Sequence, residues 1–151
     1  VADTSNGSIN VSETKGDLRL DTSNGRIEAD DVTGAVTADT SNGSIRVAIS
    51  DPAEGAPLRF DTSNGSVEVT VKRYAGNPMI LGSSNGSVTL RLPESVNAEV
   101  EAETSNGGIQ TDFPVTVSGK LNKHSLRSRL GSGGPLIKLE TSNSSVRLLR
   151  Y

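Results

Sequence analysis

Apolar and polar residues alternate along most of the chain, in short stretches that are interrupted at regular intervals. Before an interruption the pattern is apolar-x-apolar-acid-Thr, as in Leu18-Arg19-Leu20-Asp21-Thr22, and after it the pattern is Ile/Val-x-apolar, as in Ile45-Arg46-Val47. A period of two residues is typical of strands with one buried face, and no stretch sustains a helical period. The pattern therefore predicts an all-β protein.

The interruptions are copies of one turn, Thr-Ser-Asn-Gly, found at 4–7, 22–25, 40–43, 62–65 and 104–107, with variants at 83–86 and 141–144. Asn-Gly suits a tight turn because both residues tolerate positive φ. The asparagines are spaced 18, 18, 22, 21, 21 and 37 residues apart, and the last gap predicts that one copy has decayed or been replaced within it. The predicted turn residues are Asn6, Asn24, Asn42, Asn64, Asn85, Asn106 and Asn143, with Gly7, Gly25, Gly43, Gly65, Gly86 and Gly107.

Two architectures fit such repeats. An antiparallel meander or barrel needs each turn to adopt a tight hairpin conformation, but it does not need the turns to have the same sequence. A β-solenoid places each turn against its own copy, so that like residues form hydrogen-bonded ladders at a spacing of about 4.8 Å. Because the turns are nearly identical, we expect a single solenoid domain of about seven to eight coils over residues 1–151.

The segment 113–135 lacks the repeat. We expect it to be irregular, either as a degenerate coil or as a segment folded over an edge, with a flexible Gly-rich turn at its end. Residues 1–119 carry a net charge of −9 and residues 120–151 a net charge of +6. This asymmetry predicts head-to-tail association through the terminal coils, which would grow a filament.

Composition narrows the function further. Only 32% of the residues are hydrophobic and four are aromatic, which predicts a thin aliphatic core. The net charge of −3 argues against a nucleic-acid partner, and the absence of cysteine excludes disulfides and thiol chemistry. No apolar stretch has the length of a membrane span or of a signal-peptide core, so we expect no membrane insertion by this segment and neither signal nor anchor within it.

The repeated Thr-Ser-Asn-Gly-Ser-Ile/Val units, followed by Gly-Gly-Pro-Leu-Ile-Lys-Leu-Glu-Thr-Ser-Asn at 133–143, resemble the bacterial putative-adhesin domains of unknown function. The resemblance covers the whole chain, and it departs from the family pattern at Ser144, which stands where the other turns have glycine. It implies a β-solenoid displayed outside the cytoplasm, at the cell surface or extracellularly. It implies little chemistry.

The asparagines could present a row of amides to a ligand, but a ladder uses its own donors and acceptors, so we expect a structural role. An acidic row precedes them, formed by Asp3, Asp21, Asp39 and Asp61 and continued by Glu103 and Glu140. Such a row could collect Ca²⁺ or other cations. The alternative, which we favour, is that each acid accepts turn hydrogen bonds while Arg19, Arg59 and Lys138 supply countercharge.

The threonines of the turns suggest an ice-binding surface, yet alternation with Leu18 and Leu20 points Thr22 inward or into the turn. His124 is the only histidine and lies in a polar stretch, so no multi-histidine metal site exists. The acids follow the repeat, as structural residues do, so we expect no catalytic residue, metal ion or cofactor.

The sequence therefore favours a non-enzymatic structural or adhesive module, with a surface protein or glycan as partner. A subunit of a head-to-tail filament is the first alternative, and a carbohydrate-processing β-helix enzyme with paired carboxylates is the second.

Overall fold

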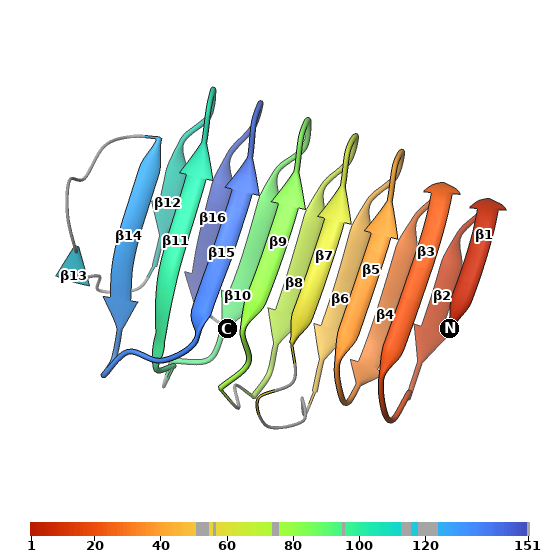
Figure 1. Cartoon of the computed structure of the whole chain (residues 1–151), viewed down its shortest axis with the longest axis horizontal. Helices are drawn as coiled ribbons and strands as arrows, with labels where there is room; N and C mark the ends of the chain where they lie inside the picture. Colours follow the sequence, from red (N-terminus) through yellow and green to blue (C-terminus); the bar gives the residue numbers. More distant parts are fainter. Residues whose placement is uncertain are drawn as a thin grey trace.

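The alternating stretches form strands, and the Thr-Ser-Asn-Gly turns connect them in pairs (Figure 1). The computed structural model describes residues 1–50, 55, 57–73, 76–94, 96–112, 116–117 and 124–150. All regular structure over these residues is β-strand. Each coil consists of a strand in one sheet, a turn, and a strand in a second sheet that runs back. The predicted all-β solenoid is confirmed.

The first sheet has nine strands over the described residues, in the order β1 (Ala2–Asn6), β3 (Leu18–Asn24), β5 (Val36–Thr40), β7 (Leu58–Thr62), β9 (Met79–Ser83), β15 (Leu136–Thr141), β11 (Ala98–Thr104), β14 (Ser125–Leu130) and β13 (Thr116–Val117). The second has seven over the same residues, in the order β12 (Ile109–Thr111), β16 (Val146–Arg150), β10 (Val88–Leu92), β8 (Val67–Val71), β6 (Ile45–Ile49), β4 (Ile27–Val32) and β2 (Ile9–Ser12).

Equivalent residues of neighbouring coils lie directly opposite one another. Thr4 pairs with Thr22, Thr22 with Thr40, and Thr40 with Thr62, all between parallel strands. A meander would pair consecutive strands in antiparallel fashion, so the meander or barrel alternative is wrong. Parallel pairing in register is what places each turn against its own copy.

The core is a narrow layer of aliphatic side chains between the two sheets. Leu20, Ile27, Val69 and Leu139 are fully buried, and Phe60 is the one aromatic residue that the described chain buries there. Each such side chain contributes about 1.5 to 3 kcal/mol on burial. The strands bury every second residue, as the alternation predicts.

The order of the coils in space differs from their order in the chain. We number the coils by their turns, from coil one at Asn6 to coil seven at Asn143. Strand β15 pairs with both β9 and β11, and β16 pairs with both β10 and β12. Coil seven, the last in the sequence, therefore lies between coil five (β9, β10) and coil six (β11, β12), as Figure 1 shows.

This arrangement corrects two expectations. Coil seven (residues 136–150) does not form the end of the stack, because it is internal. The 37-residue gap does not hold a decayed parallel coil in its described part, because the turns at Asn106 and Asn143 are direct neighbours.

Strand β14 instead runs antiparallel to β11 and covers the edge of the first sheet. The alternative in which the non-repeating segment folds over an edge is thus confirmed for residues 125–130. Residues 113–115 and 118–123 lie outside the described part of the chain.

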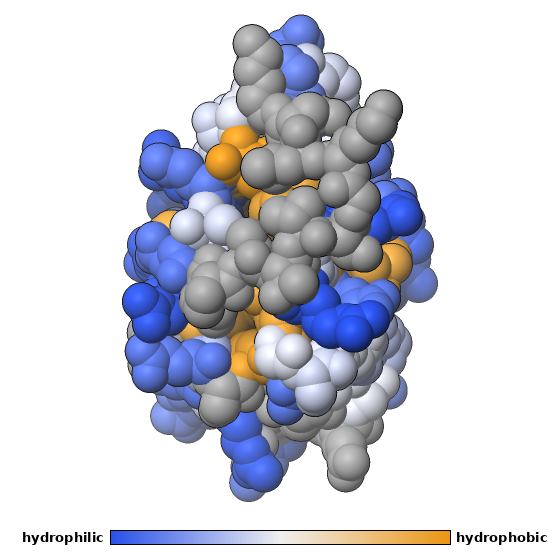
Figure 2. Space-filling model, turned by 90° about the vertical axis from the view of Figure 1, so that its left-hand side faces the viewer, coloured by the Kyte–Doolittle hydropathy of each residue, from blue (hydrophilic) through white to orange (hydrophobic). Residues whose placement is uncertain are grey.

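Figure 2 looks onto the end of the solenoid that carries β14. Apolar residues lie in the middle of this face and hydrophilic residues surround them.

Among the described residues, no helix has the length and hydropathy needed to cross a membrane.

Candidate functional site

The turns of the seven coils form one edge of the solenoid, at the top of Figure 1, and the repeat concentrates its polar residues there. Serine and asparagine side chains of the turns are exposed, whereas the preceding threonine is buried. This turn edge is the first surface on which a function could be built.

The structure brings all seven predicted asparagines into one row. From Asn24 onward, each side-chain amide donates from Nδ2 to Oδ1 of the asparagine in the preceding coil of the row, over distances between 2.6 and 2.8 Å. The order of the row is Asn6, Asn24, Asn42, Asn64, Asn85, Asn143, Asn106. Coil seven thus fills its place in the ladder like any other coil.

In coils two to seven, a buried hydroxyl side chain of the turn makes a second connection between coils. Thr62 Oγ1 donates to the Gly43 carbonyl at 2.9 Å, and Thr141 Oγ1 donates to the Gly86 carbonyl at 2.7 Å. Ser83 makes the same bond to Gly65 where serine replaces threonine. With Thr22, Thr40, Thr62, Thr104 and Thr141 at most 5% exposed, the described threonines of these five turns offer no outward array to ice.

Glycine follows six of the seven ladder asparagines, with Ser144 after Asn143 as the exception, and at five of these glycines the coils approach too closely for a side chain. A Cβ on Gly43 would lie 1.8 Å from the Gly25 carbonyl oxygen, and one on Gly65 would lie 2.0 Å from that of Gly43. Gly25, Gly86 and Gly107 have the same constraint, whereas Gly7, in the first coil, has only Thr4 Oγ1 within 4 Å. The glycines are therefore required by the stacking contact itself.

The acidic row lies on the outward face of the first sheet. Asp3, Asp21, Asp39 and Asp61 are in register on consecutive strands, and Gly82 then separates them from Glu140 and Glu103. The described residues contain no group of three or more His, Cys, Asp or Glu placed to hold a metal ion. Lys138 lies 3.6 Å from Glu140, so part of the predicted countercharge is in place.

The charged form of the Asp39 carboxyl, in the middle of this row, is destabilised by its surroundings. Partial burial of its carboxyl raises the pKa, and the charges of Asp61 and Asp21 raise it further. The cations Arg59 and Arg19 lower the pKa, but they do not cancel the first two effects. The row therefore holds at least one carboxylate whose charged form is less favourable in the folded protein than in the unfolded chain.

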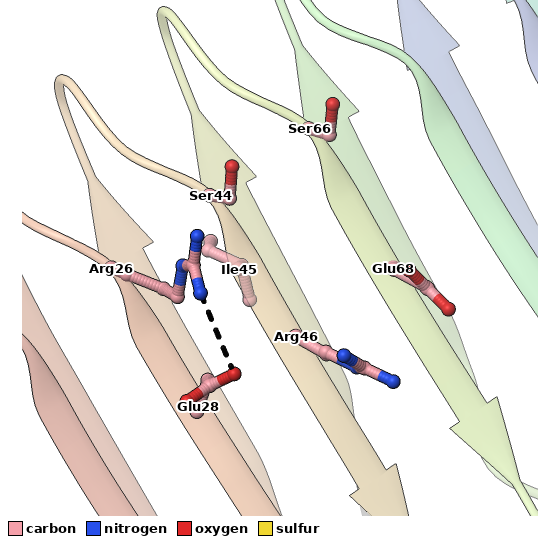
Figure 3. Close-up of a pocket in the computed structure, with 7 residues that line it drawn as sticks. All are labelled: Arg26, Glu28, Ser44, Ile45, Arg46, Ser66 and Glu68. Atoms are coloured by element: carbon pink, nitrogen blue, oxygen red, sulfur yellow. Dashed lines mark ion pairs between the residues drawn. The ribbon is translucent and has the colours of Figure 1, made fainter.

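A second surface lies on the outward face of the other sheet, where β4, β6 and β8 run side by side (Figure 3). Glu28, Arg46 and Glu68 lie opposite one another on these strands, so acid and base alternate. Ser44 and Ser66 precede the strands and help to line a shallow hollow of about 210 Å³. Arg26 lies 3.8 Å from Glu28 within it, and Arg91 Nη1 donates to Glu68 at 3.0 Å.

His124 lies near the end of the ladder. Its Nδ1 is 3.0 Å from the Gly107 carbonyl oxygen, and the ring lines a hollow of about 240 Å³ together with Glu103, Glu140 and Ser105. Two carboxylates thus come near the single histidine, although they are 37 residues apart in the chain. The sequence analysis did not foresee this grouping, because it depends on the place of coil seven.

Two further features were missed at the sequence level. The row of Glu28, Arg46 and Glu68 could have been found, since each residue lies four positions after a ladder asparagine. Asn97 could not have been found, because it has no counterpart in the other repeats. Its Oδ1 accepts hydrogen bonds from Ser132 N and Oγ, at 3.0 and 3.2 Å.

No family model matches the chain, and no curated protein matches it in sequence. One solved structure that the chain distantly resembles is that of a putative cell adhesion protein from Clostridium sporogenes, with 10% sequence identity and a TM-score of 0.38. The match covers 97% of this chain and 93% of that one. A likeness this distant supports neither a family nor a function.

The close approach of the turns gives a direct prediction. Gly65→Ala should destabilise the protein by about 2 kcal/mol or more, because its Cβ would meet the Gly43 carbonyl oxygen and the backbone must shift. Gly108→Ala is the matched control, since a Cβ there has no atom within 4 Å. Urea unfolding of both variants measures the difference. Equal stabilities would contradict the steric role of the turn glycines.

The acidic row gives a prediction about pH. The raised pKa of Asp39 means that the unfolded chain releases this proton more readily, so stability is lost as the pH rises through the ordinary range of the carboxyl toward the raised value. Asp39→Asn should therefore stabilise the protein at pH 7, by less than about 1 kcal/mol because solvent screens the site, and should change little at pH 3.

Asp17→Asn, at an exposed position outside the row, is the control. Urea titrations at the two pH values test the difference. Destabilisation by Asp39→Asn at pH 7, together with a Ca²⁺-dependent rise in Tm that this variant abolishes, would favour the cation row instead.

Proposed function

We propose that this chain is a non-enzymatic β-solenoid module of the cell surface, with an adhesive or structural role. The observation that carries the proposal is the unbroken asparagine row through seven coils. Together with the buried threonines, it uses the repeated polar groups of the turns to hold coil to coil. Residues that serve stacking in every coil are not specialised for chemistry.

A stack of this kind suits a spacer or a display surface. Each coil is tied to its neighbours by two sheets, a row of amides and a row of hydroxyls, so the module is stiff along its length. Proteins built from stacked repeats use extended faces rather than deep pockets to bind their partners. The two hollows described above are shallow and lie on such faces, which favours contact with a surface over enclosure of a small molecule.

The alternating row on the second sheet is the contact surface that we assign to adhesion. Guanidinium, carboxylate and hydroxyl groups occur together in the hollow around Arg46, and they offer both donors and acceptors to a polar partner such as a glycan. The described residues provide no exposed aromatic ring, since Phe60 is buried. Recognition would therefore depend on hydrogen bonds and ion pairs.

The test is binding of the purified chain to arrays of glycans and surface proteins. We expect binding that Arg46→Ala weakens severalfold and that Arg59→Ala, an exposed arginine on the opposite sheet, leaves unchanged. Equal losses in both variants would argue against the assigned surface. Failure to bind any partner would leave the structural role alone, and release of reducing ends from a polysaccharide would overturn the non-enzymatic proposal.

A further inference from the structure

Coil seven (β15 and β16) lies in a slot between coil five and coil six, and both of these coils precede it in the chain. We call coil five and coil six the two walls of the slot. Strand β9 lies on one side of β15 and β11 on the other, while β10 and β12 flank β16 in the same way. The chain passes from coil five directly to coil six, and these two coils are held one coil apart. The slot is complete only when coil seven fills it.

The contacts of coil seven are made with the walls of the slot. Asn143 Nδ2 donates to Asn85 Oδ1 at 2.6 Å on one side, and Asn143 Oδ1 accepts from Asn106 Nδ2 at 2.7 Å on the other. The backbone repeats this pattern, since Asn143 N donates to the Ser84 carbonyl and Asn106 N to the Ser142 carbonyl. Strand β14, which precedes coil seven in the chain, pairs with β11 and β13 among the described strands and not with β15. The fit of coil seven is therefore set by the slot and not by its covalent neighbour.

Charge also favours the slot. Residues 136–150 contain Lys138, Arg147 and Arg150 against Glu140, a net charge of +2. Lys138 lies opposite Glu101 of β11, and Arg150 Nη1 donates to Glu94 at 2.9 Å. The positive charge near the end of the chain suggested an end-to-end contact. In coil seven this charge lies close to Glu101 and Glu94 of the same stack.

A short linker, Gly131–Pro135, is the covalent connection between β14 and coil seven. It crosses over the start of β11, where Gly131 and Gly133 have φ values of 60° and 83°. Cβ atoms on Gly131 and Gly134 would lie 2.1 Å from Asn97 Oδ1 and 2.5 Å from Asn97 O. Asn97 also accepts the two hydrogen bonds from Ser132, so the crossover is tight and specific.

We propose that coil seven is exchanged between copies of this chain, so that residues 136–150 of one copy fill the slot between coils five and six of another. The partner is a second copy, because it alone offers the same walls, register and charges. The contacts are identical within one chain and between two, and the linker alone decides between them. Reciprocal exchange closes a dimer, and exchange passed from copy to copy builds an open chain.

Exchange differs from the end-to-end association predicted from the charge distribution. That model places the basic coil seven at the end of the stack, whereas coil seven is internal and only β14 of the basic segment lies at an edge. Coils one to five are each joined directly along the chain to a coil that lies beside them in the stack. Coil seven is joined through the linker to β14, which lies beside neither β15 nor β16.

Cysteine pairs in this cysteine-free chain test the proposal. One full-length variant carries Ile80→Cys and a second carries Lys138→Cys, at positions that lie opposite each other on β9 and β15. The two variants are unfolded together, refolded at low and at high concentration, and then oxidised. A disulfide between the variants requires that coil seven of one has entered the slot of the other, since directly opposed positions are within bonding range.

The control pair is Arg59→Cys with Ile80→Cys, opposite each other on β7 and β9 of consecutive coils. Exchange of coil seven does not bring these positions together between chains. We expect the first pair to cross-link severalfold more than the control, increasingly with refolding concentration and in dimers or larger species by light scattering. Cross-linking no greater than in the control, with monomers at every concentration, would overturn the proposal.

Shortening the linker gives an independent measurement. Deleting 131–134 leaves Pro135 alone between Leu130 and Leu136, a reach of about 7 Å against the roughly 9.6 Å of two strand spacings. A folded deletion variant should be a dimer or larger, because its coil seven cannot reach its own slot while β14 stays on β11. A folded monomer would contradict the proposal, and if the variant does not fold, the cysteine pairs decide.

Discussion

The whole structure depends on how closely one coil can approach the next. Strand pairing sets a spacing of about 4.8 Å, and at five of the seven turns this leaves no room for a Cβ on the glycine after the ladder asparagine. Gly25, Gly43 and Gly65 meet that limit, and Asn24, Asn42 and Asn64 then stack close enough for their amides to bond. The buried threonine and the aliphatic layer beneath follow from the same register, because a shift by one residue would turn the core outward.

The same constraint limits what the module can do chemically. Side chains on the turn edge and in the core are used for stacking. Side chains with another role are therefore confined to the outward faces of the sheets and to the ends of the stack. The alternating charges around Arg46 lie on one such face, and the linker over Asn97 lies near the end that carries β14. A protein built this way offers extended surfaces and shallow hollows rather than a deep pocket.

The local part of this fold could be predicted from the sequence, and the order of the coils could not. Alternation around Leu18 and Leu20, and the near-identity of the turns, are enough to predict strands and a ladder. The place of coil seven depends on a choice among similar surfaces, because each turn offers its neighbour the same amide, hydroxyl and carbonyl groups. The gap between Asn106 and Asn143 therefore suggested a lost coil, when it reflects a coil placed elsewhere.

The most direct test of the ladder is the rate at which its asparagines deamidate in the native protein. Asn-Gly is labile when the following N–H can attack the side-chain amide, and the ladder holds both groups in place. At mildly alkaline pH, isoaspartate mapping by mass spectrometry should show slow modification at Asn24, Asn42, Asn64 and Asn85, and faster modification at Asn6, in the first coil. Rates at Asn42 and Asn64 equal to those of the unfolded chain would contradict the ladder.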